Sequence, residues 1–263
     1  MSRLEAGDLS PEEKEFPDET ADFGYRRVPA REKAGYVRRH FNSIATRYDF
    51  MNSLLSLGFH HLWKRWAIRA CGLKTGDRVM DVCGGTGDLS RLAAKAVGPQ
   101  GRIFLYDINR AMIEAGRPKM NQAPLASRVC YIQGDAERIS CRPGCMDAAL
   151  VGFGIRNLTR MERGLEEMFR ILKPGGKIMV LEFSMPTSAV FRWLYNFYSF
   201  RLMPLMGKIF AGTEKAYLYL PESIRRFPPP KELSRLLREI GFTRVAYCRM
   251  TNGIAVIYTG LKV

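Results

Sequence analysis

Two groups of residues in this sequence have the types and spacing that chemistry requires. The first is the run Asp81-Val-Cys-Gly-Gly-Thr-Gly-Asp88, in which glycines let backbone approach a ligand closely and a carboxylate stands at each end. The second is a pair of single carboxylates, Asp107 and Asp135, which each follow a later short apolar segment. Carboxylates accept hydrogen bonds from hydroxyl and amine groups, so the pattern indicates a nucleoside-type ligand.

Two ligands compete for the glycine loop. A dinucleotide would place its pyrophosphate at the start of the following helix, and its fingerprint needs a third glycine where this chain has Ser90. Asp81 and Asp88 would also repel a pyrophosphate. S-adenosylmethionine has no phosphate and carries a sulfonium and an ammonium group, so the acidic loop favours it.

The two later carboxylates fit the same ligand. Asp107 lies twenty residues after Gly87, where it can accept both ribose hydroxyls, and Asp135 can accept from the adenine amine with Ala136 beside the ring. Each has a structural alternative, because Asp107 can cap the next helix and Asp135 can be a turn residue. Asp81, Asp107 and Asp135 are each expected at the carboxyl end of a strand. Together they favour ligand binding, since ligands of open α/β sheets bind at that edge.

Alternating strands and helices must position these residues. We expect strands at residues 78–82, 102–106, 129–133, 147–152 and 177–183, with helices at 88–97, 110–121 and 161–172 between them. A helix at 231–241 and two strands around Asn252-Gly253 follow, and this pair suits a hairpin turn. The fold class is therefore α/β: a class I methyltransferase, Rossmann-like, seven-stranded sheet with a C-terminal antiparallel hairpin and helical lid segments.

The chain divides into five expected parts. Residues 1–24 are an acidic disordered tail, 25–77 an N-terminal helical cap, and 78–185 the S-adenosylmethionine-binding core. Residues 186–230 are a helical substrate and membrane lid, and 231–263 complete the core sheet. Residues 189–210 are apolar around most of a helical wheel, which predicts either a core helix or one at a lipid boundary.

Composition excludes several classes of protein. The 263 residues are 46% hydrophobic, which excludes a disordered polycation, and no uninterrupted apolar run is long enough to span a membrane. The acidic N-terminus resembles neither a secretory signal nor a transit peptide. The 6 cysteines form no CxxC pair and indicate reduced thiols in a cytoplasmic protein. Cys141 and Cys145 lack a second pair of ligands, so we expect no metal.

Longer blocks carry a family resemblance. The sequence resembles the ubiquinone/menaquinone biosynthesis C-methyltransferase family over nearly the whole chain after the tail. The specific blocks are Tyr48-Asp49-Phe50-Met51-Asn52, Phe153-Gly154-Ile155-Arg156-Asn157 and Tyr219-Leu220-Pro221-Glu222-Ser223-Ile224. The resemblance implies methyl transfer from S-adenosylmethionine to a ring carbon of a prenylated quinol. The expected cofactor residues are Asp81, Gly85, Thr86, Gly87, Asp107, Ile108, Asp135, Ala136 and, as a backbone neighbour, Gly152.

The reaction suggests further roles. A quinol carbon becomes nucleophilic when a phenolic proton leaves, so a base or a nearby cation is needed at neutral pH. Arg156 is the expected cation beside the developing oxyanion, although it can instead pair with a carboxylate at a strand end. His60 is the expected base, although it can instead be a structural residue at a helix start. Tyr48, Asn157 and Tyr217 are expected to contact the substrate.

The net charge of +15 is unevenly distributed. Residues 1–24 carry −6, residues 25–80 carry +9 and residues 186–263 carry +8. Basic residues among aromatic ones near residues 189–210 predict a peripheral position at the anionic inner face of the cytoplasmic membrane. We expect no nucleic-acid partner; a quinone-biosynthesis complex and a homodimer stay open. The alternatives are an RNA methyltransferase and a catalytically weak scaffold of such a complex.

Overall fold

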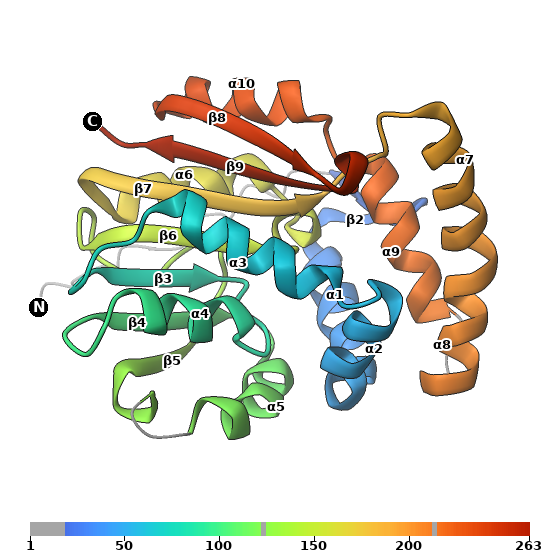
Figure 1. Cartoon of the computed structure of the whole chain (residues 1–263), viewed down its shortest axis with the longest axis horizontal. Coiled ribbons are helices and arrows are strands. Elements are labelled where there is room, and N and C mark those ends of the chain that lie inside the picture. The colour runs from blue at the N-terminus through green and yellow to red at the C-terminus, as the bar shows by residue number, and fades with distance from the viewer. Residues whose placement is uncertain (1–18, 122–124, 212–214) are drawn as a thin grey trace, which may run out of the picture.

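The computed structural model describes residues 19–121, 125–211 and 215–263. At its centre is a seven-stranded sheet with helices on both faces (Figure 1). The strands of this sheet are β3 (Arg78–Val82), β4 (Arg102–Asp107), β5 (Val129–Gln133), β6 (Met146–Gly152), β7 (Leu172–Phe183), β8 (Thr243–Met250) and β9 (Ala255–Leu261). The expected strand positions are confirmed, with β7 beginning earlier than predicted.

The spatial order of the strands is β5-β4-β3-β6-β7-β9-β8. Strands β3 to β7 run parallel, whereas β9 is antiparallel to both β7 and β8. Asn252 has a positive φ of 54° in the turn between β8 and β9, as the Asn-Gly pair predicts. The chain proceeds outward from β3 to β5 and then returns to β6, so the strand order reverses beside β3. In open α/β sheets this reversal point is where ligands bind.

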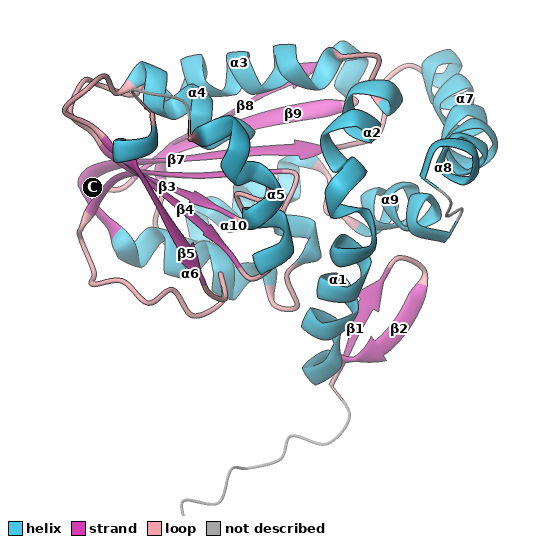
Figure 2. Cartoon of the chain, turned by 90° about the horizontal axis from the view of Figure 1, so that it is seen from below, coloured by secondary structure: helices cyan, strands magenta, loops and turns pink. Residues whose placement is uncertain are grey.

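Helices cover each face of the sheet because the central strands are nearly continuous buried runs with apolar side chains on both sides. Helices α3, α4 and α5 lie over one face and α6 and α10 over the other (Figure 2). Their bounds are α3 (Phe59–Cys71), α4 (Asp88–Ala96), α5 (Arg110–Met120), α6 (Met161–Ile171) and α10 (Pro230–Ile240). Each face buries its own apolar cluster. One cluster includes Trp63 and Leu105, and the other includes Val151 and Leu237.

A separate group of elements stands beyond the carboxyl ends of the parallel strands (Figures 1 and 2). It contains a two-stranded sheet and five helices. These are β1 (Thr20–Phe23), β2 (Arg26–Pro29), α1 (Ala30–Ile44), α2 (Tyr48–Leu55), α7 (Ala189–Phe197), α8 (Met203–Ala211) and α9 (Lys215–Arg226). A short turn, η3 (Ile155–Asn157), follows β6 and faces this group. Elements far apart in the sequence therefore meet at the strand ends.

Two expected boundaries differ in the structure. Residues 20–23 form β1 rather than part of a disordered tail, because the Phe23 ring stacks on Tyr219 with centroids 4.4 Å apart. Residues 1–18 lie outside the described residues. Helix α3 is a layer of the core rather than part of a helical cap, since Trp63, Ala67 and Cys71 are buried against the sheet.

The lid segment also differs from a single helix. Residues 189–210 form α7, a π-helical turn at Tyr198–Leu202 and α8. Ser199 is fully buried, whereas Asn196 is exposed and accepts a hydrogen bond from Arg225 of α9. Many apolar side chains of this segment point outward, with Val190 and Trp193 each 68% exposed, so the core-helix alternative is wrong. Among the described helices, none is long and apolar enough to cross a bilayer.

Candidate active site

A cavity lies where the parallel strands end, and we call it the strand-end cavity. Every strand from β3 to β6 contributes one stretch to its lining. These stretches are Cys83 and Gly85, residues 107–109, residues 134–137 and residues 152–154. Helix α1 closes the outer side through Val37 and Phe41. This is the edge at which the sequence predicts a ligand.

The glycine loop is shaped by tight internal packing. Gly87 begins α4 with a φ of 80°, and a Cβ there would lie 2.8 Å from Leu105 Cδ1. The buried Asp81 carboxylate accepts from the Ser90 backbone N–H at 2.9 Å and from its hydroxyl at 2.6 Å. Burial raises the pKa of Asp81 to about 7. Asp81 and Gly87 are not among the cavity lining, whereas Gly85 is.

Asp107 ends β4 and faces the strand-end cavity. Its carboxylate accepts from the Gly85 backbone N–H at 2.8 Å and from the Asn109 backbone N–H at 2.7 Å. Burial raises the pKa of Asp107, although both hydrogen bonds oppose the shift. Asn109 itself caps α5, because its side chain accepts from the Met112 backbone N–H, so Asp107 is not the helix cap. Asp107 can therefore accept hydroxyl groups from a ligand.

The residues that follow β5 form the opposite wall. Asp135, Ala136 and Ile108 all line the strand-end cavity, as does Gly152 at the end of β6. One Asp135 carboxylate oxygen accepts from the Glu137 backbone N–H at 2.9 Å, as the turn alternative requires. Its other oxygen is free to accept from a ligand amine, so the turn role and the ligand role are compatible.

Thr86 does not line the strand-end cavity but belongs to a polar network that we call the Lys119 clasp. The Lys119 ammonium donates to Asp49 at 2.7 Å, to Asp88 at 2.7 Å and to the Thr86 hydroxyl at 3.0 Å. The Thr86 hydroxyl donates to Asp49 at 2.6 Å, and Lys64 pairs with Asp88 at 2.7 Å. The two lysines hold the pKa of Asp88 below its usual range. The clasp ties α2 to the glycine loop and α5.

A second cavity of about 360 Å³ lies beside the first, and we call it the helical cavity. Aromatic and aliphatic side chains from α1, α2, α3, α7 and α9 dominate its wall, and none of its described lining residues is Asp or Glu. Phe41, Tyr48 and Phe153 line both cavities, so the two spaces adjoin. Phe153 holds a φ of 58°, which is unusual for a bulky residue and typical of functional sites.

Arg156 lies in η3 and lines the helical cavity. Its Nη1 donates to the Glu182 carboxylate at 2.7 Å and to the Phe153 carbonyl, and its Nε donates to the Ser223 hydroxyl at 3.3 Å. The side chains of Arg156 and Glu182 are 7% and 0% exposed. Burial raises the pKa of Glu182, and the adjacent guanidinium opposes that shift. The alternative that Arg156 pairs with a carboxylate is confirmed, and the pair holds a cation at the cavity wall.

His60 lines the helical cavity and is buried. Its Nε2 lies 3.2 Å from the Ser53 hydroxyl, and its Nδ1 has no hydrogen-bond partner among the described residues. Burial and Lys64 lower its pKa to about 4. His60, His61 and Asp88 have the spacing of metal ligands, but two lysines already occupy the Asp88 carboxylate. Gly58, rather than His60, caps α3.

The three expected substrate residues are divided between the cavities. Tyr48 lines both, Tyr217 lines the helical cavity, and Asn157 lines the strand-end cavity. The Asn157 side chain accepts from the Tyr219 hydroxyl at 2.8 Å, so it links η3 to α9. The Tyr217 hydroxyl is buried with no partner in the part of the chain that the structure describes.

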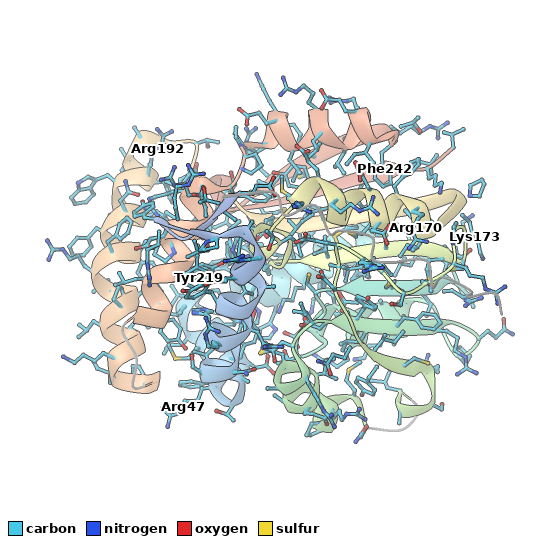
Figure 3. The ribbon with its side chains drawn as sticks, turned by 180° about the vertical axis from the view of Figure 1, so that it is seen from behind. Arg47, Arg170, Lys173, Arg192, Tyr219 and Phe242 are labelled. Carbon is cyan, nitrogen blue, oxygen red and sulfur yellow. The ribbon has the colours of Figure 1, made fainter. Side chains whose placement is uncertain are left out.

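Sequence reasoning missed two further cavity residues, His40 and Tyr219. Tyr219 extends from α9 toward α1 (Figure 3), where its ring centroid lies 4.7 Å from that of His40. Residues 186–230 were expected to be helical and Tyr219 begins one of the family blocks, but no role at the site was assigned to it. His40 gave no motif signal, and only packing places it at the site.

Comparisons with known proteins agree at two levels. The sequence profile described as the ubiE/COQ5 methyltransferase family matches residues 12–262. A curated relative from Pseudomonas savastanoi pv. phaseolicola is 44% identical over 243 residues, which are 92% of this chain and 95% of the relative. One from Stutzerimonas stutzeri is 42% identical over 252 residues, 96% and 98% of the two chains. Both are named "Ubiquinone/menaquinone biosynthesis C-methyltransferase UbiE".

Solved structures with low sequence identity share the fold. A SAM-dependent methyltransferase from Thermotoga maritima, described as a possible histamine N-methyltransferase, has a TM-score of 0.60 at 20% identity, covering 86% of this chain and 99% of its own. A Haemonchus contortus methyltransferase in complex with S-adenosylhomocysteine has a TM-score of 0.59 at 15% identity, covering 86% and 59%. The expected class I methyltransferase fold is confirmed.

Proposed function

The chain belongs to the ubiE/COQ5 methyltransferase family, and on that premise we propose that it methylates a ring carbon of a prenylated quinol in ubiquinone or menaquinone biosynthesis. It is an S-adenosylmethionine-dependent C-methyltransferase. One structural observation carries the assignment of substrates: an acidic strand-end cavity and an apolar helical cavity adjoin at Phe41, Tyr48 and Phe153. A donor and an apolar acceptor can thus meet at one point.

The strand-end cavity fits the cofactor. The half-satisfied Asp107 carboxylate accepts the ribose hydroxyls, and Ile108 and Ala136 flank the adenine ring, with Asp135 free to accept the amine. Gly85 and Gly152 present backbone to the ligand. Asp81, Thr86 and Gly87 would hold the glycine loop in shape rather than contact the cofactor. Asp81 and Thr86 are hydrogen-bonded within the protein, and Gly87 packs against Leu105. When bound, the cofactor supplies an electrophilic methyl group on a sulfonium.

The helical cavity fits the quinol and the start of its prenyl tail. Its wall is largely aromatic and aliphatic, which suits an isoprenoid. Tyr48 lies where the cavities adjoin and would contact the ring, and Tyr217 would contact it from α9. Asn157 reaches the site through Tyr219. The cofactor and the apolar quinol would thus occupy separate but adjoining cavities.

Arg156 stabilises the reactive form of the quinol. Loss of the phenolic proton places negative charge on the oxygen and on the ortho carbon that attacks the methyl group. The guanidinium stays charged at every working pH, and Glu182 fixes it in place. A fixed cation in an apolar cavity lowers the energy of the oxyanion more than water does. Arg156 therefore orients and stabilises the phenolate.

The outward face of α7 and α8 supports peripheral attachment to a membrane. Trp193, Phe197 and Ile209 are exposed on it, whereas Phe191 and Leu194 of the same helix also line the helical cavity. A prenyl tail held in lipid would thus reach the cavity along this face. Basic residues of the same segment would meet anionic headgroups. We expect stronger binding to anionic vesicles than to neutral ones, and equal binding would contradict this attachment.

A methyl-transfer assay tests the proposed function. The enzyme is given S-adenosylmethionine with short-chain demethylmenaquinol or 2-polyprenyl-6-methoxy-benzoquinol, and the methylated product is measured by mass spectrometry. We expect product from reduced rings only, because an oxidised ring has no phenolic proton to lose. Product from the quinone alone would contradict the phenolate mechanism. RNA methylation is not favoured, and a scaffold would give no turnover.

A further inference from the structure

The reaction needs a proton acceptor in the helical cavity, and few lining residues qualify. Among the described residues no carboxylate lines this cavity. Burial raises the pKa of the lining tyrosines, and lysine and arginine hold their protons at neutral pH. The remaining candidates are two histidines, His40 of α1 and His60 of α3.

The two histidines differ in the state of their ring nitrogens. His60 Nε2 lies 3.2 Å from the Ser53 hydroxyl, and His60 Nδ1 is buried without a partner among the described residues. His40 is half-buried, and its ring makes no hydrogen bond to any described residue. Aromatic rings pack around it instead: the His40 ring centroid lies 5.1 Å from that of Phe41 and 4.7 Å from that of Tyr219. Its nitrogens are therefore uncommitted.

His40 also lies close to the point of reaction. Its neighbour Phe41 lines both cavities, and Arg156 is near enough to act electrostatically on the His40 ring. The groups that face His40 are Tyr219 from α9, Arg156 from η3 and the uncharged Phe23 ring from β1. A quinol hydroxyl beside Arg156 would thus meet an unoccupied imidazole nitrogen.

We propose that His40 is the general base that removes the phenolic proton. This proposal rests on the proposed function. His40 takes the proton, and the ring carbon forms its bond to the methyl group as the carbon–sulfur bond breaks. The ring carbon then releases its own proton to water, and the phenolate recovers a proton from His40. One proton is released in total, and His40 returns to its neutral form.

The electrostatics of the site match this cycle. Burial and the Arg156 charge lower the pKa of His40 to about 4, so the free enzyme holds a neutral imidazole at pH 7. A phenolate formed between the two side chains offsets the Arg156 charge and favours the imidazolium. The base therefore gains its proton affinity only when the reactive anion is present.

The test measures kcat/KM against pH for the wild type, His40→Gln and the matched surface control His61→Gln. We expect a flat profile for the wild type and the control between about pH 5 and pH 8. For His40→Gln we expect a loss of about 10²–10⁴-fold at pH 7 and a rate that rises about tenfold per pH unit. Such a slope reports the phenolate fraction, which a structural role for His40 would not produce.

Chemical rescue gives a second, independent readout. His40→Ala opens space in the cavity wall, so added imidazole is expected to restore activity to this variant and not to His60→Ala. A flat profile in His40→Gln, or rescue of His60→Ala alone, overturns the proposal for His40. Absence of methyl transfer by the wild type would instead contradict the proposed function, so the two failures are distinguishable.

Discussion

The two cavities are built in different ways. The strand-end cavity is assembled largely from residues at the ends of consecutive strands or within four positions beyond them, and hydrogen bonds such as that from the Gly85 backbone N–H to the Asp107 carboxylate tie these residues together. The helical cavity is assembled from helices between α1 and α9, more than a hundred residues apart, through side-chain packing. The first cavity carries the carboxylates Asp107 and Asp135 and is built largely from strand ends, whereas the second carries no Asp or Glu among its described lining residues and joins helices far apart in sequence. Donor recognition and acceptor recognition are therefore expected to respond separately to substitution.

The largest effect is expected at Arg156. Replacing it with alanine removes the cation beside the oxyanion, so kcat should fall by about 10²–10³-fold. The dissociation constant for S-adenosylmethionine, measured by calorimetry, should change by less than about twofold because the cofactor lies in the other cavity. Arg156→Lys keeps a charge beside Glu182 and serves as the folded control. A collapse of cofactor affinity would break the separation of the two cavities.

Asp107→Asn is the converse experiment on the strand-end cavity. It should weaken S-adenosylmethionine binding by about 10–100-fold, since hydrogen bonds to a charged acceptor contribute about 1.5–3 kcal/mol. At saturating cofactor, kcat and the KM for the quinol should stay near wild type. Circular dichroism checks that the variant keeps the overall secondary structure of the wild type. A change in the quinol KM alone would indicate that Asp107 acts on the quinol rather than on the cofactor, contrary to this prediction.

The pH dependence of stability tests the protonation state of Asp81, whose carboxyl group holds the glycine loop beside the strand-end cavity. Burial raises the pKa of Asp81 to about 7, so the folded protein holds a proton that the unfolded chain loses near pH 4. The contribution of Asp81 to the free energy of unfolding therefore falls as pH rises from about 4 to about 7. Asp81→Asn cannot titrate, so its melting temperature should gain a few degrees on the wild type across this window. Parallel melting curves would contradict the raised pKa.

The smallest effect is expected at the Lys119 clasp, which joins the two regions. A double-mutant cycle of Asp49→Asn and Lys119→Met should give a coupling energy of about 0.5–1 kcal/mol in urea unfolding. The value is small because these side chains are 45% and 24% exposed. The control is a second double-mutant cycle on the exposed ion pair of Glu114 and Arg117 in α5, with Glu114→Gln as one of its two variants. Zero coupling would show that the ion pair of Asp49 and Lys119 does not stabilise the fold.

The same contrast explains what the sequence could predict. Strand positions and the carboxylates Asp107 and Asp135 follow from local apolar runs and their ends, so they are visible in the sequence. His40 and Tyr219 face a shared cavity only because α1 packs against α9, which no local pattern encodes. The burial of Ser199 was likewise hidden, since a helical wheel shows a thin polar stripe without showing which of its residues the fold covers.

The outward apolar face of α7 and α8 also has a consequence for the colloidal behaviour of the protein. In water, such a patch promotes self-association, and what keeps copies apart is their shared charge of +15. At 1 M ionic strength the Debye length shrinks to about 3 Å, so that repulsion no longer acts across the gap between two molecules. The purified protein should therefore be monodisperse in dilute buffer and should associate reversibly as salt is added.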